Sequence, residues 1–305
     1  MKTIRIGTRK SKLAVWQADY VANLLESDGF TTEKVLIETK GDKIQDVAIA
    51  KIGSKGVFTE ELEAMLESGE VDIAVHSAKD LQSSLPGGFE IIAFSERAFI
   101  EDVIVSEKAI DLTSKSLVLG TSSTRRIAAL KHFYPHIQTV DMRGNLQTRI
   151  AKMQSGVCDG LVLAHAGVHR MNYDHLIKVK LPVSEFIPPV GQGCIAVEAH
   201  QNLDTDKKSH IYHKVNNAVV EKQLRAERAY LKKLEGGCSI PVFAFATMSE
   251  DKILLKGGIF SLDGKIRIIH EVTGSNSEEV GISLADHVLG NGGLEVLREI
   301  KKRLG

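Results

Sequence analysis

The 305-residue sequence has little cysteine, no excess of either charge and no long apolar run. Its three cysteines, Cys158, Cys194 and Cys238, are odd in number and widely spaced, which excludes a disulfide framework and a C-x-x-C zinc pattern. Lys and Arg total 39, and so do Asp and Glu, so the chain lacks the basic surplus of a general polyanion binder, and we expect no nucleic-acid partner. No stretch approaches about 18 consecutive apolar residues, so we expect no membrane span.

The remaining composition is that of an ordinary globular protein. Hydrophobic residues make up 43% and charged residues 26%, which excludes disorder and fibrous structure. The length predicts two or three domains of roughly 100–200 residues each. The first seven residues alternate like a strand and do not resemble a signal peptide. We therefore expect a soluble, cytoplasmic protein.

Strand and helix patterns alternate along the first two thirds of the chain. Apolar residues within 11–27 are spaced three or four apart, which predicts an amphipathic helix after a strand at 3–7. The pattern restarts at 117–120, where a strand again ends in Gly-Thr before a hydroxyl-rich turn and a helix. Strands that alternate with helices are typical of βαβ units, so we predict two similar α/β lobes with mixed, mainly parallel sheets.

The last third of the chain has a different pattern. Residues 187–193 combine two prolines with two glycines, which suits a crossover between lobes. A long helix is predicted near 215–234, and strands at 252–260 and 265–272 flank a hairpin sequence. Further helices complete a small α+β unit. The predicted domains are 1–97 with 194–213 (lobe 1), 98–193 (lobe 2) and 214–305 (a C-terminal α+β domain).

Two strand–turn–helix segments gather basic and hydroxyl side chains at predicted helix starts. A helix start offers free N–H groups and a positive dipole end, and arginine binds a carboxylate or phosphate through two hydrogen bonds. Several arginines in one cleft would therefore hold a polyanionic ligand; the alternative is a set of solvated surface arginines. The residues are Arg9, Lys10 and Ser11 at the first start, Thr121, Ser123, Arg125 and Arg126 at the second, and Arg143, Gly144 and Arg149 in a third basic turn.

A histidine- and aspartate-containing segment, His76-Ser77-Ala78-Lys79-Asp80, directly follows a predicted strand. The carboxyl ends of parallel strands are where α/β proteins bind their ligands. A fixed carboxylate at Asp80 could stabilise a cationic intermediate or move a proton. The alternative is a surface ion pair with Lys79, which contributes little energy.

The segment Gly236-Gly237-Cys238 places a cysteine after two glycines, which leave the sulfur unshielded. Such a thiol could attach a group covalently, although a buried free cysteine is the alternative. Cys158 and Cys194 lie in apolar runs and are expected in the core.

Other short patterns indicate less. Residues 51–56 are basic and glycine-rich but form no Walker loop, so a loop that contacts an anion and an ordinary turn both remain open. The pairs His165 and His169, and His210 and His213, have spacings that could suit a metal, but no H-E-x-x-H motif is present. We expect no metal site.

Together these segments resemble the porphobilinogen deaminase (hydroxymethylbilane synthase) family over essentially the whole chain. Any one of them is weak, but nine in the expected order do not arise by accident. The resemblance is carried by Ile6–Arg9 with Ser11–Ala14, Thr39–Asp42, Gly53–Phe58, His76–Asp80, Gly120–Arg126, Arg143–Asn145, Val190–Gly193, Ala226–Arg228 and Leu234–Cys238.

The resemblance implies three domains, two of them lobes like those of periplasmic binding proteins. It implies a transferase in which four porphobilinogen molecules lose ammonia and join head to tail on a covalent dipyrromethane cofactor. Hydrolysis then releases hydroxymethylbilane, a precursor in tetrapyrrole (haem) biosynthesis. Cys238 matches the cysteine that holds this cofactor by a thioether, and Asp80 matches the catalytic aspartate. A monomer is expected.

The family's basic and polar contacts also have matches in this chain. Each pyrrole unit brings two carboxylates, so a growing chain needs many cations, and this gives the clustered arginines a purpose. The matches to cofactor-binding residues are Lys79, Asp80, Thr121, Ser123, Arg125, Arg126, Arg143 and Gly144, and those to substrate-binding residues are Arg9, Ser11, Lys51, Lys55, Arg149, Arg170 and Gln192.

The chain departs from the family pattern at several positions. Gln82 stands where a proline is usual, Glu101 where an arginine is usual, and His165 where a small residue is usual. Ala199-His200 replaces a common Cys-Arg, and Ser239 replaces a glutamine. A second hypothesis is a non-catalytic, two-lobed carboxylate-binding protein of the same ancestry, which predicts an unmodified Cys238.

Overall fold

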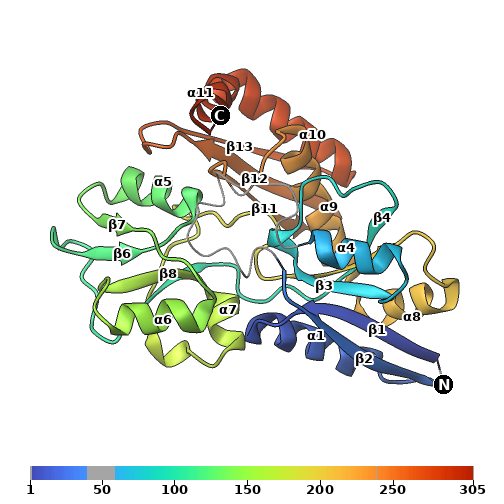
Figure 1. Cartoon of the computed structure of the whole chain (residues 1–305). Coiled ribbons are helices and arrows are strands. Elements are labelled where there is room, and N and C mark those ends of the chain that lie inside the picture. The colour runs from blue at the N-terminus through green and yellow to red at the C-terminus, as the bar shows by residue number, and fades with distance from the viewer. Residues whose placement is uncertain (1, 40–58, 238, 305) are drawn as a thin grey trace.

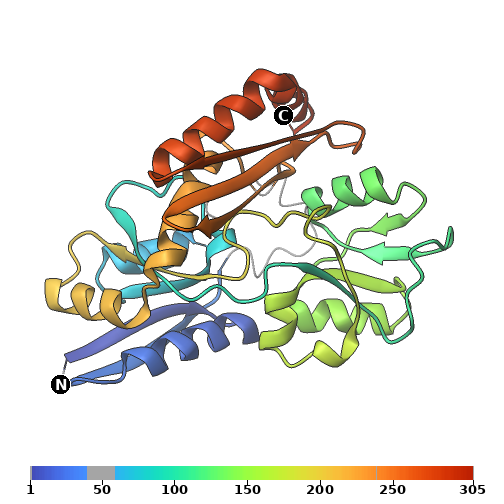
Figure 2. The same ribbon diagram turned by 180° about the vertical axis from the view of Figure 1, so that it is seen from behind.

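The computed structural model describes residues 2–39, 59–237 and 239–304. Within them the chain forms two α/β lobes and a C-terminal domain, each built on its own sheet (Figure 1). The two lobes lie side by side, and the C-terminal domain lies across both of them, as the front and back views agree (Figures 1 and 2). This confirms the predicted fold class.

Lobe 1 contains a five-stranded sheet of order β2-β1-β3-β10-β4. β1 pairs in parallel with β2 and β3, whereas β10 runs antiparallel between β3 and β4. Ser11 begins α1, because its hydroxyl accepts a hydrogen bond from the Ala14 N–H. The elements are β1 (Lys2–Arg9), α1 (Lys12–Leu25), β2 (Phe30–Ile37), α4 (Glu60–Glu67), β3 (Ile73–Ser77), the 3₁₀ turn η1 (Ala78–Asp80), β4 (Phe89–Phe94), β10 (Ile195–His200) and α8 (Thr205–Val215).

Lobe 2 contains a second five-stranded sheet, of order β7-β6-β8-β5-β9. β6 pairs in parallel with β7 and β8, and β5 runs antiparallel to β8 and β9. The elements are β5 (Asp102–Val105), β6 (Val118–Gly120), α5 (Thr124–Phe133), β7 (Gln138–Val140), α6 (Leu146–Gln154), β8 (Gly160–Ala164), α7 (His165–Arg170), the 3₁₀ turn η2 (Asp174–Leu176) and β9 (Ile177–Lys180).

The chain crosses between the lobes twice. Residues 95–101, the first crossover, lead from β4 into β5, and residues 181–194, the second crossover, lead from β9 back into β10. The strands that follow these crossovers, β5 and β10, run against their neighbours. Among the described strands of each lobe, antiparallel pairings are therefore as numerous as parallel ones, which is more than the sequence pattern predicted.

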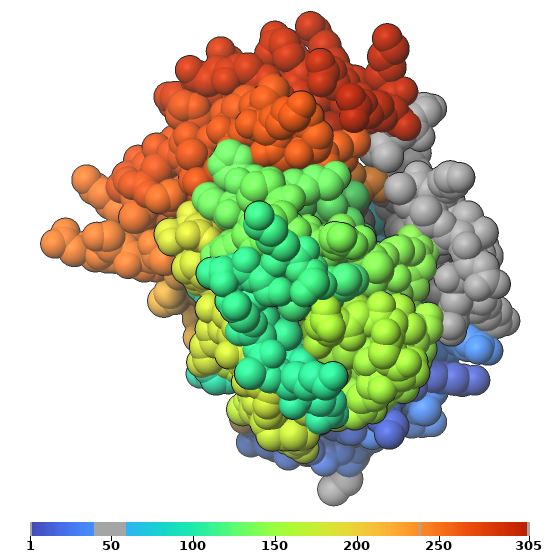
Figure 3. Space-filling view, turned by 90° about the vertical axis from the view of Figure 1, so that its left-hand side faces the viewer, coloured from blue at the N-terminus to red at the C-terminus, as the bar shows by residue number. Residues whose placement is uncertain are grey.

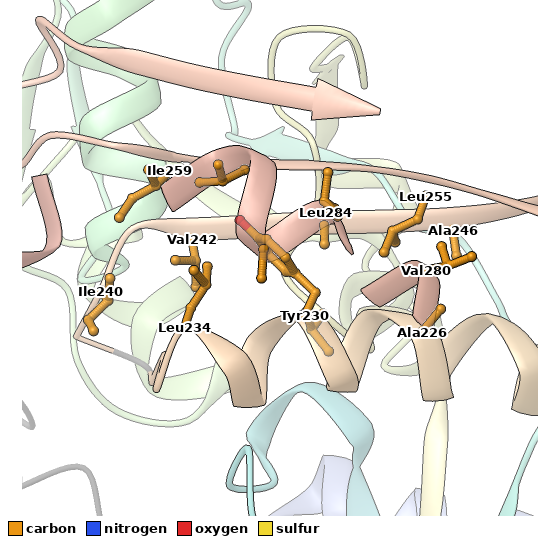
Figure 4. Packing of buried hydrophobic residues seen from close by; sticks show 14 of the residues in the cluster. Ala226, Tyr230, Leu234, Ile240, Val242, Ala246, Leu255, Ile259, Val280 and Leu284 are labelled. Atoms are coloured by element: carbon orange, nitrogen blue, oxygen red, sulfur yellow. The ribbon is translucent and has the colours of Figure 1, made fainter. Parts of the chain in front are cut away.

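The C-terminal domain is a three-stranded antiparallel sheet covered by helices. Tyr230 is fully buried in its core (Figure 4). The Tyr230 hydroxyl donates a 2.8 Å hydrogen bond to the Gly258 carbonyl. The elements are α9 (Ala218–Lys233), β11 (Val242–Ser249), β12 (Lys252–Phe260), β13 (Arg267–Gly274), α10 (Ser277–Val288), the irregular turn η3 (Leu289–Gly293) and α11 (Leu294–Leu304).

The C-terminal domain shares a core cluster with lobe 2. Phe243 and Phe260 of its sheet pack with Leu130 of α5 and Phe186 of the second crossover. Figure 3 shows this side of the molecule, with lobe 2 in green directly below the orange and red C-terminal domain. The domain that carries the Gly-Gly-Cys segment is therefore packed against lobe 2.

Two sequence expectations are confirmed in this region. The long helix expected near 215–234 is α9, which Asn217 caps by accepting hydrogen bonds from the N–H groups of Val219 and Val220. The predicted hairpin is confirmed, with β11 added as a third strand. The domain boundaries predicted at 97/98, 193/194 and 213/214 stay a prediction.

Candidate active site

Lys79 and Asp80 lie in η1, directly after the carboxyl end of β3. A pocket at this end of the lobe 1 sheet brings Asp80 together with Arg9, the last residue of β1, and Ser11, the N-cap of α1. Asp80 is exposed, whereas Lys79 is half-buried. The rest of the pocket wall includes Gln17, Thr59, His76 and Ser77.

The second crossover lies directly on η1. Gly191 has a φ of +76°, and a Cβ there would stand 2.9 Å from the Lys79 backbone nitrogen, so glycine permits this approach. The next residue, Gln192, is fully buried, with its Oε1 3.5 Å from Lys79 Nζ. Its Nε2 donates to the Ile100 carbonyl at 2.7 Å and to Asp102 Oδ1 at 3.0 Å. Gln192 thus connects lobe 1 to lobe 2.

Arg125 and Arg126, in the first turn of α5, both bind one buried carboxylate. Arg125 donates to Asp102 Oδ2 at 2.6 Å, and Arg126 donates to Asp102 Oδ1 at 2.7 Å. The side chains of these three residues are at most 8% exposed. The Nε of each arginine is buried, and no described residue accepts a hydrogen bond from either. Asp102, Arg125 and Arg126 together carry one net positive charge, and the two Nε atoms are hydrogen-bond donors without an acceptor among the described residues.

More cations surround this trio. Lys79 interacts electrostatically with Asp80 and with Arg125 and Arg126. Burial lowers the pKa of Lys79 to about 8, although Asp80 opposes that shift. Arg149, in α6, interacts with Arg126 and Asp80, and burial lowers its pKa as well. Lys79 and Arg149 are both half-buried, and a bound anion would stabilise their positive charges.

The third basic turn begins α6. Gly144 has a φ of +110°, and its carbonyl accepts a 2.7 Å hydrogen bond from Arg149 Nε. Asn145 caps the helix by accepting from the Thr148 N–H at 2.9 Å. Arg143 lies beside Asp141, at 3.2 Å, and interacts electrostatically with Arg149. The sequence prediction that these residues belong to one cluster with Arg126 and Asp80 is consistent with this arrangement.

The remaining predicted residues lie around the same region in different roles. Thr121 is buried, and its hydroxyl accepts from the Ser123 N–H at 3.3 Å, while Ser123 begins α5. Arg170 ends α7 and donates a 2.9 Å hydrogen bond to the carbonyl of Gly193 in the second crossover. Its guanidinium lies 5.3 Å from the centre of the Trp16 ring. Ligand contacts of these residues stay predictions.

Three predicted residues, Lys51, Lys55 and Cys238, lie outside the described residues. On either side of Cys238, Leu234 and Ile240 are buried in the core of the C-terminal domain. Among the residues with described positions, no group of three or more His, Cys, Asp or Glu side chains could hold a metal ion. In the same part of the chain, no helix combines the length and the apolar character needed to cross a membrane.

Sequence reasoning missed Asp102, the acceptor for both arginines. Its only signal is a carboxylate placed directly before the apolar run Val103–Val105, where a fully buried acid requires a partner. In the sequence analysis, His76 was named only as part of the segment His76–Asp80 and was given no role of its own. It is 6% exposed and lies 3.0 Å from Glu198 of β10, so it forms part of the pocket's buried wall.

Comparisons with known proteins identify similar sequences along the chain. Residues 4–208 match the family described as porphobilinogen deaminase, dipyromethane cofactor binding domain, and residues 222–290 match porphobilinogen deaminase, C-terminal domain. Curated relatives named porphobilinogen deaminase include one from Cytophaga hutchinsonii, 54% identical over 99% of this chain and 98% of the relative. Another, from Desulfosudis oleivorans, is 54% identical over 98% of each chain.

A third curated relative, from Desulfitobacterium hafniense, carries the same name and is 44% identical over 100% of this chain and 99% of its own. Among solved structures, a TRAP periplasmic solute binding protein from Ochrobactrum anthropi matches with a TM-score of 0.42 and 13% identity, over 77% of each chain.

Proposed function

Because this chain belongs to the porphobilinogen deaminase family, we propose that it condenses four porphobilinogen molecules head to tail into hydroxymethylbilane, releasing ammonia at each step. It then acts as a transferase of tetrapyrrole synthesis. The observation that carries the proposal is the group of cations around Asp80, to which lobe 1 contributes Lys79 and lobe 2 contributes Arg126 and Arg149. A ligand with many carboxylates is what this charge pattern fits.

The family's dipyrromethane cofactor fits the residues present. Its acetate and propionate groups need charged donors, and the buried Nε atoms of Arg125 and Arg126 are donors without an acceptor among the described residues. When bound, the cofactor supplies the pyrrole end to which new units are joined. Lys79, Arg125, Arg126 and the turn at Arg143-Gly144 would hold its carboxylates, and Cys238 would carry the thioether.

Asp80 is the proposed catalytic residue. Loss of ammonia from porphobilinogen leaves a cation delocalised over the pyrrole, and a fixed carboxylate stabilises such charge most where it develops. Asp80 is exposed in the pocket and lies near Lys79 and Arg149, so that it is held in a strongly cationic region. The surrounding cations would bind the substrate's carboxylates.

The other cations and hydroxyls of the cleft serve the substrate. Arg9 and Ser11 share the pocket with Asp80, and Arg149 interacts electrostatically with Asp80. Arg170, Gln192, Lys51 and Lys55 are proposed as substrate-binding residues from the sequence match alone. We propose a cytoplasmic monomer that has no nucleic-acid or membrane partner.

The mass of the purified protein tests this function directly. We expect the intact protein to be heavier than its sequence by a dipyrrole unit and to release ammonia from porphobilinogen. Cys238→Ser should lose the added mass, whereas Cys158→Ser, a buried cysteine of lobe 2, should keep it. An unmodified Cys238 together with no ammonia release would instead favour the two-lobed carboxylate-binding protein.

A further inference from the structure

Glu101 and His165, which the sequence analysis singled out separately, meet in the structure. Glu101 ends the first crossover, and His165 is the first residue of α7, 64 residues later. His165 Nδ1 lies 2.9 Å from Glu101 Oε1, and the His165 backbone N–H donates a 3.1 Å hydrogen bond to the Glu101 carbonyl. The imidazole is 3% exposed. The charged side chain of Glu101 and the buried imidazole of His165 are therefore hydrogen-bonding partners.

Both ring nitrogens of His165 face carboxylates. Nε2 lies 3.4 Å from Asp174 Oδ1 in η2, on the side opposite Glu101. A carboxylate only accepts hydrogen bonds, so two facing carboxylates are both satisfied only by an imidazolium, which donates from both nitrogens. The outer His169 lies 3.0 Å from Asp174 Oδ2, so it shares this second carboxylate.

An aromatic ring and one lysine complete the surroundings of the pair. Phe99 of the first crossover stacks on His165 with ring centres 4.0 Å apart and an interplanar angle of 23°. A cation against an aromatic face is favourable when shielded from water. Lys180 of β9 lies 3.8 Å from Glu101 Oε1 and 5.8 Å from the centre of the Phe99 ring. Glu101 therefore lies between two cationic groups.

The helix that begins at His165 ends at Arg170, a proposed substrate-binding residue. Arg170 donates to the Gly193 carbonyl, which also accepts a 3.0 Å hydrogen bond from the Ala98 N–H of the first crossover. α7 is thus fastened to the first crossover at its start and to the second crossover at its end. A shift of α7 at His165 would move Arg170 relative to the cleft.

We propose that Glu101 and His165 form a charge pair that positions α7, and through it Arg170, for binding the carboxylates of the substrate. The pair does not touch the substrate, and both residues are positioning residues. The part of this inference that concerns substrate binding rests on the proposed function; the pairing itself does not.

The arrangement predicts which substitutions compensate one another. Glu101→Arg alone places a guanidinium beside the His165 imidazole and Lys180, which removes an attraction and adds a repulsion. His165→Ala alone leaves Asp174 without its buried partner. In the double variant Glu101→Arg/His165→Ala, the longer arginine can reach Asp174 across the space that the imidazole leaves, so an opposite-charge contact returns.

The experiment compares these three variants with the wild-type holoenzyme. We expect each single substitution to raise KM for porphobilinogen by about fivefold and to leave kcat within about twofold of wild type. In the double variant, KM should return most of the way to the wild-type value. The matched control is His169→Ala, which removes the exposed histidine of the same helix and should leave KM within about twofold. Unchanged KM in both single variants, multiplied losses in the double variant, or an equal rise in the control would overturn the proposal.

Thermal unfolding separates this inference from the proposed function. If the wild-type protein released no ammonia from porphobilinogen, the proposed function would fail, and melting temperatures would still test the pair. The double variant should then recover most of the melting temperature lost in Glu101→Arg. Should Glu101→Arg not fold, Glu101→Gln replaces it, with a smaller rise in KM and a smaller fall in melting temperature. Adding His165→Ala to Glu101→Gln should then change neither value much further, and fully additive effects would contradict the pairing.

Discussion

Asp102 accepts a 2.6 Å hydrogen bond from Arg125, and this contact joins the start of β5 to the first turn of α5 inside lobe 2. The same carboxylate accepts from Arg126 at 2.7 Å and from Gln192 at 3.0 Å. Both arginines and the carboxylate are buried. One acid therefore holds in place both of the arginines that we propose bind the ligand's carboxylates.

Removal of that acid is expected to destabilise the protein strongly. Asp102→Asn leaves two buried guanidinium groups without a counter-charge, so we expect a loss of about 3–5 kcal/mol in the free energy of unfolding. Urea denaturation monitored by circular dichroism measures it. The matched control is Asp111→Asn, an exposed aspartate that binds Thr113, with an expected loss of about 0.5 kcal/mol or less. Equal losses in the two variants would show that the Asp102 charge is not needed.

The same carboxylate makes the free energy of unfolding depend on pH in the acidic range. Burial alone would raise the pKa of Asp102, but Arg125 and Arg126 outweigh burial and hold this pKa well below its ordinary value of 3.8. A depressed pKa contributes stability that is fully present above the unfolded value and is lost as pH falls toward the folded one. We expect the free energy of unfolding to fall from about pH 4 downward, with a shallower fall in Asp102→Asn. Parallel curves for the two proteins would contradict this assignment.

A structural feature can be predicted from the sequence when residues close together in the chain determine it. Ser11 at the start of α1 and the hairpin before β13 follow from signals within a few residues, and both are confirmed. The long helix predicted near 215–234 is confirmed as α9, whose start has a local signal in the N-cap residue Asn217. These features need no knowledge of distant contacts.

Features that depend on contacts between distant residues could not be predicted from the sequence. Asp102 meets Arg125 only because β5 lies beside β8 in the lobe 2 sheet, and strand pairing of that kind has no local pattern. Glu101 and His165 were noticed as separate exceptions, and their contact spans 64 residues. The clustering of the basic turns was predictable, because the carboxyl ends of neighbouring parallel strands meet.

Substitution of the glycine in the third basic turn is expected to destabilise the protein. Gly144 has a φ of +110°, and a Cβ there would stand 2.7 Å from Thr148 Cγ2. Gly144→Ala should therefore lower the free energy of unfolding by about 1 kcal/mol more than Gly156→Ala. Gly156 has a φ of +88° but open space around a Cβ, so it controls for backbone strain alone.

A compensating change sharpens that comparison. Thr148→Ser removes the crowded methyl group and keeps the hydroxyl that lies 2.9 Å from Asn145 Oδ1. Thr148 Cβ would still stand 2.9 Å from the added Cβ, so Thr148→Ser combined with Gly144→Ala should restore part of the excess loss in chemical denaturation. If the double variant stayed as unstable as Gly144→Ala alone, the contact with Thr148 would not be the cause.

Lys79 makes substrate binding sensitive to alkali. Burial lowers its pKa to about 8, from an ordinary 10.5, so the side chain loses its positive charge as pH rises through about 8. Because kcat/KM follows ionisation in the free enzyme, it should fall by about tenfold between pH 7 and 9.5. Lys79→Arg keeps its charge throughout this range and should give a flatter profile at a lower level. A fall of the same size in Lys79→Arg would assign the ionisation to another group.

Asp80 is expected to matter for turnover and little for folding. It is exposed in the pocket, so Asp80→Asn preserves shape and costs little stability, whereas it removes the negative charge that faces the developing cation. We expect kcat to fall by about 10²-fold or more, with the melting temperature within about 2 °C of wild type. Single-turnover measurement of ammonia release separates the chemical step from product release. The matched control is Asp19→Asn, a surface carboxylate of α1 that pairs with Lys34, and it should keep full activity. A wild-type rate in Asp80→Asn would mean that the cations alone organise the reaction and that the carboxylate has no part in it.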